Sequence, residues 1–137
     1  MPYWNFTNYK MEIISLFFIF IAIEFFESNW QKSDTLFGLI KNNFSIFKKN
    51  IFLYFILHPS FFYTIFLSFY LNNFGFLMSS ILILKFLDIS FKLILMKNLL
   101  NGREIDELLQ FNMQITPLFR YMNVIIYPIT FIFATTL

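Results

Sequence analysis

Cysteine is absent from this chain, histidine occurs once and glycine three times. The absence of cysteine excludes disulfides, thiolate metal sites and cysteine nucleophiles. One histidine is too few for a typical histidine-rich metal or haem site, and no glycine-rich phosphate loop or HExxH pattern occurs. We therefore expect no enzymatic activity, no catalytic or metal-binding residues and no cofactor.

Charged residues are also scarce, at 13% of the chain, whereas hydrophobic residues make up 58%. An ordinary soluble domain carries about 25% charged residues. Together with a mean hydropathy of +0.67, this composition predicts an integral membrane protein. The Lys and Arg residues stand beside apolar segments and form no separate basic face, so we expect no nucleic-acid binding.

Four apolar stretches predict membrane spans, at residues 11–27, 51–71, 74–96 and 118–135. About 20 apolar residues suffice to cross the ~30 Å hydrocarbon core of a bilayer. We therefore predict an all-α integral membrane protein with about four transmembrane helices in a single domain. A signal peptide is a competing interpretation of the first stretch, but the EFFESN sequence at its end lacks a small-residue cleavage site.

Local signals shape the second and third spans. Pro59 lacks a backbone N–H and its ring clashes with the preceding turn, so it should kink or unwind the second span. Asn72 and Asn73 form the only polar break before the third span. A break this short predicts that the two spans form a helical hairpin.

The segments between the spans are more polar. Residues 34–48 have apolar side chains at helical spacing with lysines between them. They predict an amphipathic helix, capped by Ser33 or Asp34, that either lies in the membrane interface or packs under its own bundle. A short cytoplasmic helix is expected at residues 103–115, with Asn101 and Glu104 as a capping box. The expected interfacial or lipid contacts are Tyr3, Trp4, Tyr9, Trp30, Lys41, Lys48, Lys49 and Arg120.

Basic residues set the expected orientation. They follow the first and third spans and are missing from the turn between the second and third. By the positive-inside rule, both termini should face away from the cytoplasm. The bias towards residues with A/T-rich codons, including 23 phenylalanines, indicates a bacterium with such a genome, although an organelle-encoded chain would look similar. We therefore expect the protein in the bacterial inner membrane.

The third span contains Lys85, Asp88 and Lys92 at positions i, i+3 and i+7, which share one helix face. An ionisable side chain near the bilayer centre costs about 2.5 to 3.5 kcal/mol on insertion scales, so this face must be buried against protein or water. Asp88 can pair with either lysine, which leaves one positive charge over. We expect Glu24, near the end of the first span, to neutralise it by pairing with Lys92.

His58, the only histidine, lies opposite Leu87 and Asp88 when residues are counted outwards from the hairpin turn. Beside a carboxylate, an imidazole can relay protons near neutral pH. The alternatives are that His58 donates to a carbonyl freed by Pro59 or lies near the interface. The predicted polar network therefore comprises Glu24, His58, Lys85, Asp88 and Lys92. It has three alternative roles: docking a partner helix, lining an ion or proton pathway, or fixing helix packing.

The leading expectation for function is an accessory or assembly subunit of a larger membrane complex. Its expected partners are the lipid bilayer and either another membrane protein or further copies of the same chain. The alternative is a small oligomeric transporter or channel, with Lys85, Asp88 and His58 along its path. No stretch of the sequence resembles a family motif.

Overall fold

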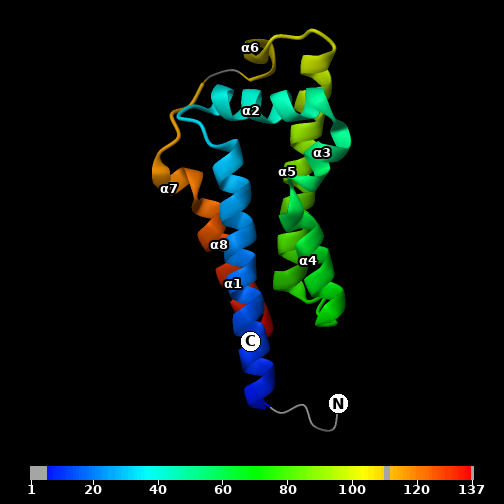
Figure 1. Ribbon diagram of the computed structural model, residues 1–137, viewed down its shortest axis with the longest axis vertical. Helices are drawn as coiled ribbons and strands as arrows, with labels where there is room; N and C mark the ends of the chain where they lie inside the picture. The colour runs from blue at the N-terminus through cyan, green and yellow to red at the C-terminus, as the bar shows by residue number, and fades with distance from the viewer. Residues whose placement is uncertain (1–5, 110–111, 137) are drawn as a thin grey trace.

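The computed structural model describes residues 6–109 and 112–136, and eight helices occur in them (Figure 1). In chain order they are α1 (Phe6–Gln31), α2 (Leu36–Lys49), α3 (Ile51–Ile56), α4 (Pro59–Tyr70), α5 (Phe76–Leu100), α6 (Ile105–Leu108), α7 (Pro117–Arg120) and α8 (Met122–Thr136). The predicted helical class is confirmed for these residues. The expected interfacial residues Tyr3 and Trp4 lie outside the described part of the chain.

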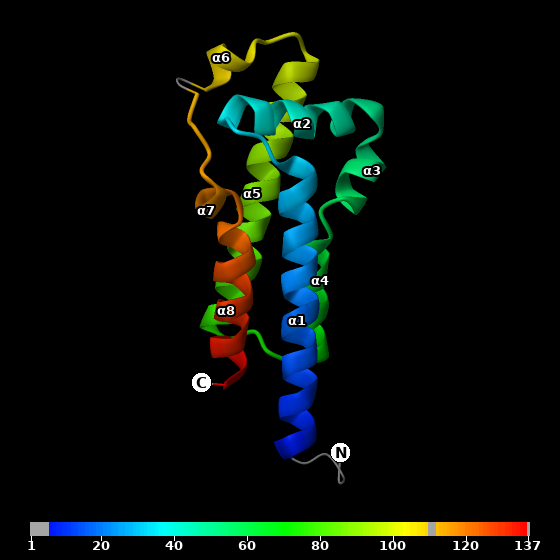
Figure 2. The ribbon, with the colours of Figure 1, turned by 60° about the vertical axis from the view of Figure 1, so that its left-hand side comes forward.

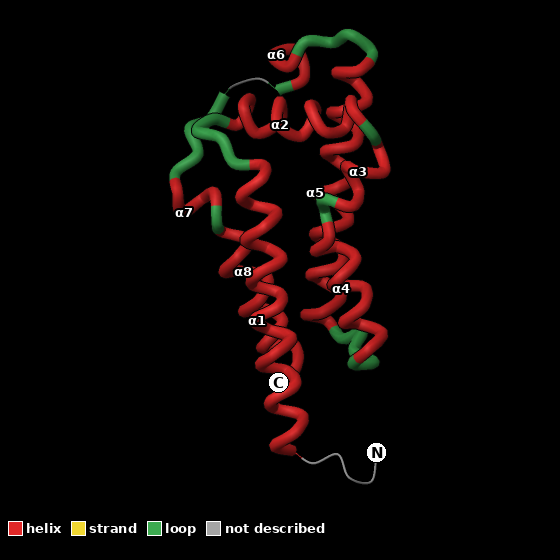
Figure 3. Tube along the Cα trace, in the orientation of Figure 1, coloured by secondary structure: helices red, strands yellow, loops and turns green. Residues whose placement is uncertain are grey.

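Two long helices, α1 and α5, run in the same direction along the molecule (Figures 1 and 2). The α8 helix packs against both of them, and α4 packs against α5 and α1. The α2 helix lies across one end of this bundle, where it contacts α3, α5 and α1. Figure 3 shows that short loops join the successive helices from α1 to α5.

In the parts of the chain that the structure describes, no helix joins sufficient length with the apolar character that a bilayer crossing needs. The predicted fold class, an integral membrane protein with about four transmembrane helices, is therefore wrong. The same finding overturns the expected description as a multi-pass protein. It also overturns the expected location in a bacterial inner membrane with both termini on the non-cytoplasmic side.

The reason lies in how the four apolar stretches divide. The second stretch breaks at His58, which leaves α4 with 12 residues and a length of about 18 Å at 1.5 Å per residue. The fourth divides at Tyr121 into α7, with four residues, and α8, with 15. The long helices α1 and α5 carry ionisable side chains along their length. These are Lys10, Glu12, Glu24 and Glu27 in α1, and Lys85, Asp88, Lys92 and Lys97 in α5.

Helix boundaries follow from capping residues. Thr35, one residue beyond the expected Ser33 or Asp34, caps α2 by accepting a hydrogen bond from the Gly38 N–H. The α2 helix packs on α3 and α5, as in the second of the two interpretations, with Ile40 buried. The helix expected at 103–115 is only the four-residue α6, and Glu104, the N-cap residue that precedes it, makes no side-chain capping hydrogen bond. Residues 110 and 111 of that range lie outside the described residues.

Two hydrophobic clusters form the core. One contains Ile13, Leu16, Phe20, Leu67, Met78, Ile81 and Phe131, from α1, α4, α5 and α8. The other lies under α2 and contains Ile40, Tyr54, Leu95 and Met96. On α5, the residues between Ile81 and Leu95 include the three charged side chains singled out in the sequence. A polar layer therefore separates the two clusters along the length of the bundle.

We predict that Phe20→Ala lowers the free energy of unfolding by about 3 to 5 kcal/mol, because it opens a cavity between α1, α4 and α8. Phe20 is fully buried and its ring packs on Tyr63 and Phe131. Phe18→Ala is the matched control, since Phe18 lies on the same helix with 61% of its surface exposed. Denaturant unfolding measures both variants, and equal losses would contradict this description of the core.

Candidate functional site

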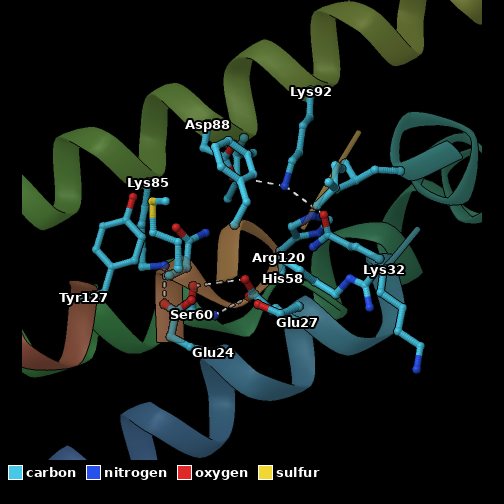
Figure 4. A pocket seen from close by; sticks show the side chains of 18 of the residues that line it. Glu24, Glu27, Lys32, His58, Ser60, Lys85, Asp88, Lys92, Arg120 and Tyr127 are labelled. Carbon is cyan, nitrogen blue, oxygen red and sulfur yellow. Dashed lines mark hydrogen bonds and ion pairs between the residues drawn. The ribbon is translucent and has the colours of Figure 1, made fainter. Parts of the chain in front are cut away.

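The polar layer is built by α1 and α5 with matching spacing. The α1 helix supplies Glu24, Glu27 and Gln31, and α5 supplies Lys85, Asp88 and Lys92, in each case at i, i+3 and i+7. This spacing places the three side chains of each helix on one face. Figure 4 shows Glu24 and Glu27 of α1 and Lys85 and Lys92 of α5 reaching towards each other between the two helices.

Glu24 and Lys85 form an ion pair in the interior. The side chains of Lys85 and Glu24 are only 6% and 1% exposed. The Lys85 ammonium also lies over the ring of Tyr127 from α8, 3.9 Å from its centroid, which is a favourable cation–π position. Burial raises the pKa of the Glu24 carboxyl, while the positive charge of Lys85 opposes that rise.

The expected partner of Glu24, Lys92, was the wrong lysine. The α1 helix continues to Gln31, so Glu24 lies about two turns before its end and level with Lys85. Gln31 takes the position expected for Glu24, because its Oε1 accepts a hydrogen bond from Lys92 at 2.9 Å. Lys92 also pairs with Asp88 on its own helix, at 3.1 Å.

Glu27 holds the start of α4. One carboxylate oxygen accepts from the Ser60 N–H at 2.7 Å, and the other accepts from the Ser60 hydroxyl at 3.1 Å. Pro59 is the first residue of α4, so the Ser60 N–H is one of the donors left free at the helix N-terminus. A carboxylate there also benefits from the helix dipole. Nevertheless, burial raises the pKa of Glu27 to about 7, against the opposing effect of Lys85.

Sequence reasoning overlooked Glu27 and Gln31. Their signal was present, because they follow Glu24 at the same i, i+3 and i+7 intervals that drew attention to the charges of α5. The predicted span ended at residue 27, whereas α1 continues to Gln31.

A chain of hydrogen bonds extends the layer under α2. Gln31 Oε1 accepts from the Asn43 amide at 3.1 Å as well as from Lys92. The Asn43 carbonyl oxygen accepts from the Tyr54 hydroxyl at 2.9 Å. Because Gln31, Asn43 and Tyr54 come from α1, α2 and α3, these bonds fix the position of α2 across the bundle.

His58 lies at the break between α3 and α4. Its Nδ1 is 2.7 Å from the Tyr54 carbonyl oxygen. A carbonyl oxygen only accepts, so Nδ1 carries the proton and Nε2 of the neutral ring holds a lone pair. The Nε2 atom is buried and has no hydrogen-bond partner. Burial, aided by the charge of Lys92, lowers the pKa of His58 to about 4.

The position of His58 bears on both of its sequence interpretations. The bond to Tyr54 matches the interpretation in which the imidazole donates to a carbonyl near Pro59. His58 also lines the same cavity as Asp88, as counting from the hairpin turn suggested. Trp30, expected at a lipid interface, instead donates to the Leu57 carbonyl at 2.8 Å and packs edge-on against His58.

The layer encloses a cavity of about 260 Å³. Its ionisable lining residues are Glu24, Glu27, Lys32, His58, Lys85, Asp88, Lys92, Arg120 and Tyr127. Arg120, expected to reach a lipid interface, donates from Nη2 to Asp34 at 3.1 Å, while its buried Nε has no partner. Lys32 and Phe119 also line the cavity and are exposed, so the cavity opens to the surface. All five residues of the predicted polar network line this one cavity.

The outer side of α5 has the opposite character. Leu84, Leu87 and Phe91 are 52%, 55% and 54% exposed. Together with Asp88 they fall within about 100° of arc at ~100° per residue, and we call these four residues the outer face of α5. The Asp88 side chain is 49% exposed, whereas its partner Lys92 is 13% exposed.

The remaining predicted interfacial residues, Lys41, Lys48 and Lys49, are exposed on α2. No group of three or more His, Asp or Glu side chains among the described residues is placed to hold a metal ion. Compared with known proteins, the chain matches no protein-family model, no curated protein and no solved structure. Its function must therefore be argued from these two surfaces, the polar cavity and the outer face of α5.

We predict that breaking the Glu24–Lys85 pair by Lys85→Met or Glu24→Gln destabilises the fold by about 3 kcal/mol or more, because each leaves one buried charge unpaired. The double variant should lose less free energy of unfolding than the two single variants lose together, since no unpaired charge remains in it. A double-mutant cycle in denaturant measures this coupling. The exposed pair of Arg103 and Glu107 is the control, with an expected coupling below about 1 kcal/mol. If the losses in free energy of unfolding from the Glu24 and Lys85 variants were additive, the two residues would not be coupled and the prediction would be wrong.

We predict that Glu27 and His58 give opposite pH dependence. The pKa of Glu27 rises from 4.5 to about 7 on folding. Its contribution to the free energy of unfolding is therefore present below pH 4.5 and is lost as pH rises through 7. The pKa of His58 falls from 6.5 to about 4 on folding. Its contribution to the free energy of unfolding is therefore present above pH 6.5 and is lost as pH falls through 4. Between pH 4.5 and 6.5 the two effects oppose each other.

Variants separate these two effects. Relative to the unmodified protein, Glu27→Gln should become more stable as pH rises from 4.5 to 6.5, by up to about 1 kcal/mol per pH unit. His58→Asn should become less stable over the same range. Urea midpoints at several pH values measure the slopes, and parallel slopes for the two variants would contradict the assignment.

Proposed function

We propose that this protein is a non-catalytic assembly subunit that binds a larger partner protein through the outer face of α5. The observation that carries this proposal is the exposure of Leu84, Leu87 and Phe91 side by side on a long, regular helix. Contiguous exposed apolar patches on a protein surface mark sites of interaction. A helix with such a face is suited to contact with a second apolar helix.

The charged residues of α5 restrict which kind of partner helix fits the outer face. Lys85 is occupied by Glu24 and Tyr127, and Lys92 by Asp88 and Gln31, so neither lysine is free to meet a partner. Asp88 pairs with Lys92 through Oδ2, but it alone of the three is half-exposed, at the edge of the apolar outer face, so its carboxylate is also accessible to a partner. Complementary charge therefore favours a partner helix that is apolar and carries one Lys or Arg opposite Asp88.

We predict that Asp88→Lys and Phe91→Ser each abolish association of the chain with its partner. The first places like charges opposite each other, and the second removes apolar contact area. The experiment isolates the tagged full chain at its native expression level under mild conditions and determines the mass of the intact particle. Phe52→Ser is the matched control, because Phe52 is 75% exposed on α3, away from the outer face.

Support requires more than capture of another protein. The partner must be present in fixed stoichiometry, must be lost with both outer-face variants and must be retained with Phe52→Ser. Reversing one basic residue of the partner helix to Glu should then restore binding to Asp88→Lys. A particle that contains only this chain, or a partner that tolerates both outer-face variants, overturns the proposal.

A further inference from the structure

We infer that the polar cavity between α1 and α5 binds a small hydroxycarboxylate, with the hydroxyl donating to His58 Nε2 and the carboxylate accepting from Arg120 Nε. This inference is independent of the outer face of α5. It depends on the hydrogen-bond needs, the charge and the size of the cavity.

Three buried atoms that line the cavity make no hydrogen bond, and two of them have no ion-pair partner either, since Glu24 Oε1 pairs with Lys85. His58 is 3% exposed, and its Nε2 holds a lone pair because Nδ1 donates to the Tyr54 carbonyl. Arg120 Nε carries a hydrogen that nothing accepts, although Arg120 Nη2 is bound to Asp34. An unpaired buried polar group costs about 1 to 3 kcal/mol, so each atom favours a ligand that completes it. The cavity therefore requires one donor and one acceptor from its ligand.

The acids and lysines in the interior of the cavity are already paired. Both oxygens of Glu27 accept from Ser60, Glu24 pairs with Lys85, and Lys92 is held by Asp88 and Gln31. A ligand therefore need not displace an internal contact. The two orphan atoms alone define where it binds.

The charge of the lining favours an anion. The four basic side chains Lys32, Lys85, Lys92 and Arg120 face the three acids Glu24, Glu27 and Asp88. Asp34, which pairs with Arg120, has a side chain that is 94% exposed and does not line the cavity. The charges of the lining therefore sum to one excess positive charge, which comes from the exposed Lys32 at the mouth of the cavity and which a single carboxylate neutralises.

The volume limits the ligand to a few heavy atoms. Pockets for drug-sized ligands occupy about 300 to 1,000 Å³, and this cavity of about 260 Å³ is below that range. It equals roughly nine water molecules at about 30 Å³ each. A three-carbon hydroxy acid fits this space, and it reaches it past the exposed residues Lys32 and Phe119.

The test uses the single histidine of the chain. Long-range proton–nitrogen NMR of the ¹⁵N-labelled full chain gives one imidazole, and its Nε2 resonance reports a new hydrogen bond directly. We expect lactate to shift the Nε2 resonance in a saturable manner. Propionate, which lacks the hydroxyl, should not shift it, and propane-1,2-diol, which lacks the carboxylate, should bind at least about tenfold more weakly.

Two variants locate the ligand. His58→Asn keeps a side-chain N–H for the Tyr54 carbonyl but removes the Nε2 acceptor, and Arg120→Lys keeps the charge but removes Nε. Calorimetry should show lactate affinity reduced by about tenfold or more in each, with unchanged circular dichroism. Lys41→Met is the control, because Lys41 is exposed on α2 and does not line the cavity.

Each outcome decides the inference. An Nε2 resonance that lactate leaves in place means that the cavity holds only water and overturns it. Equal affinity for lactate and propionate also overturns it, because the hydroxyl then makes no contact with His58. Lactate binding that survives both cavity variants places the anion elsewhere on the protein, with the same consequence.

Discussion

The ion pair between Glu24 and Lys85 is the interaction on which the arrangement of the bundle depends. Both side chains lie in the interior, next to a hydrophobic cluster that offers no other partner for a charge. Isolated ions are costly to bury, so the two helices that carry them must stay within reach of each other. This requirement keeps α1 and α5 on opposite sides of one polar layer, with α8 packed against both.

The break at His58 serves the same layer. In a continuous helix the Ser60 N–H would donate to a carbonyl of the preceding turn. Because α4 starts at Pro59, this N–H is free to donate to Glu27 instead. The break also places the His58 ring in the lining of the cavity, where Nδ1 donates to the Tyr54 carbonyl. The helix start at Pro59 thus leaves the Ser60 N–H free for the Glu27 carboxylate, and the same break positions the His58 imidazole.

Local patterns predicted some of this structure and misjudged the rest. The helical class, the break at Pro59 and the shared face of Lys85, Asp88 and Lys92 follow from spacing and proline chemistry, which act within a few residues. The partner of Glu24 depends on how far α1 extends and on its level against α5, which no local pattern contains. The membrane spans were wrong because composition sums apolar residues over a stretch. It does not reveal that α4 has only 12 residues or that α7 ends before α8 begins.

The matching intervals on α1 and α5 have a mechanical consequence. Both observed contacts, Glu24 with Lys85 and Gln31 with Lys92, join residues 61 positions apart. If α5 slid by one turn, about 5.4 Å, in one direction, Asp88 would face Glu24 and Lys85 would enter the cluster around Phe20. A slide in the other direction would leave Glu24 level with Ile81 and without a cation. Only one axial register of α5 against α1 therefore satisfies both contacts, and the charged residues disfavour packings shifted by one turn.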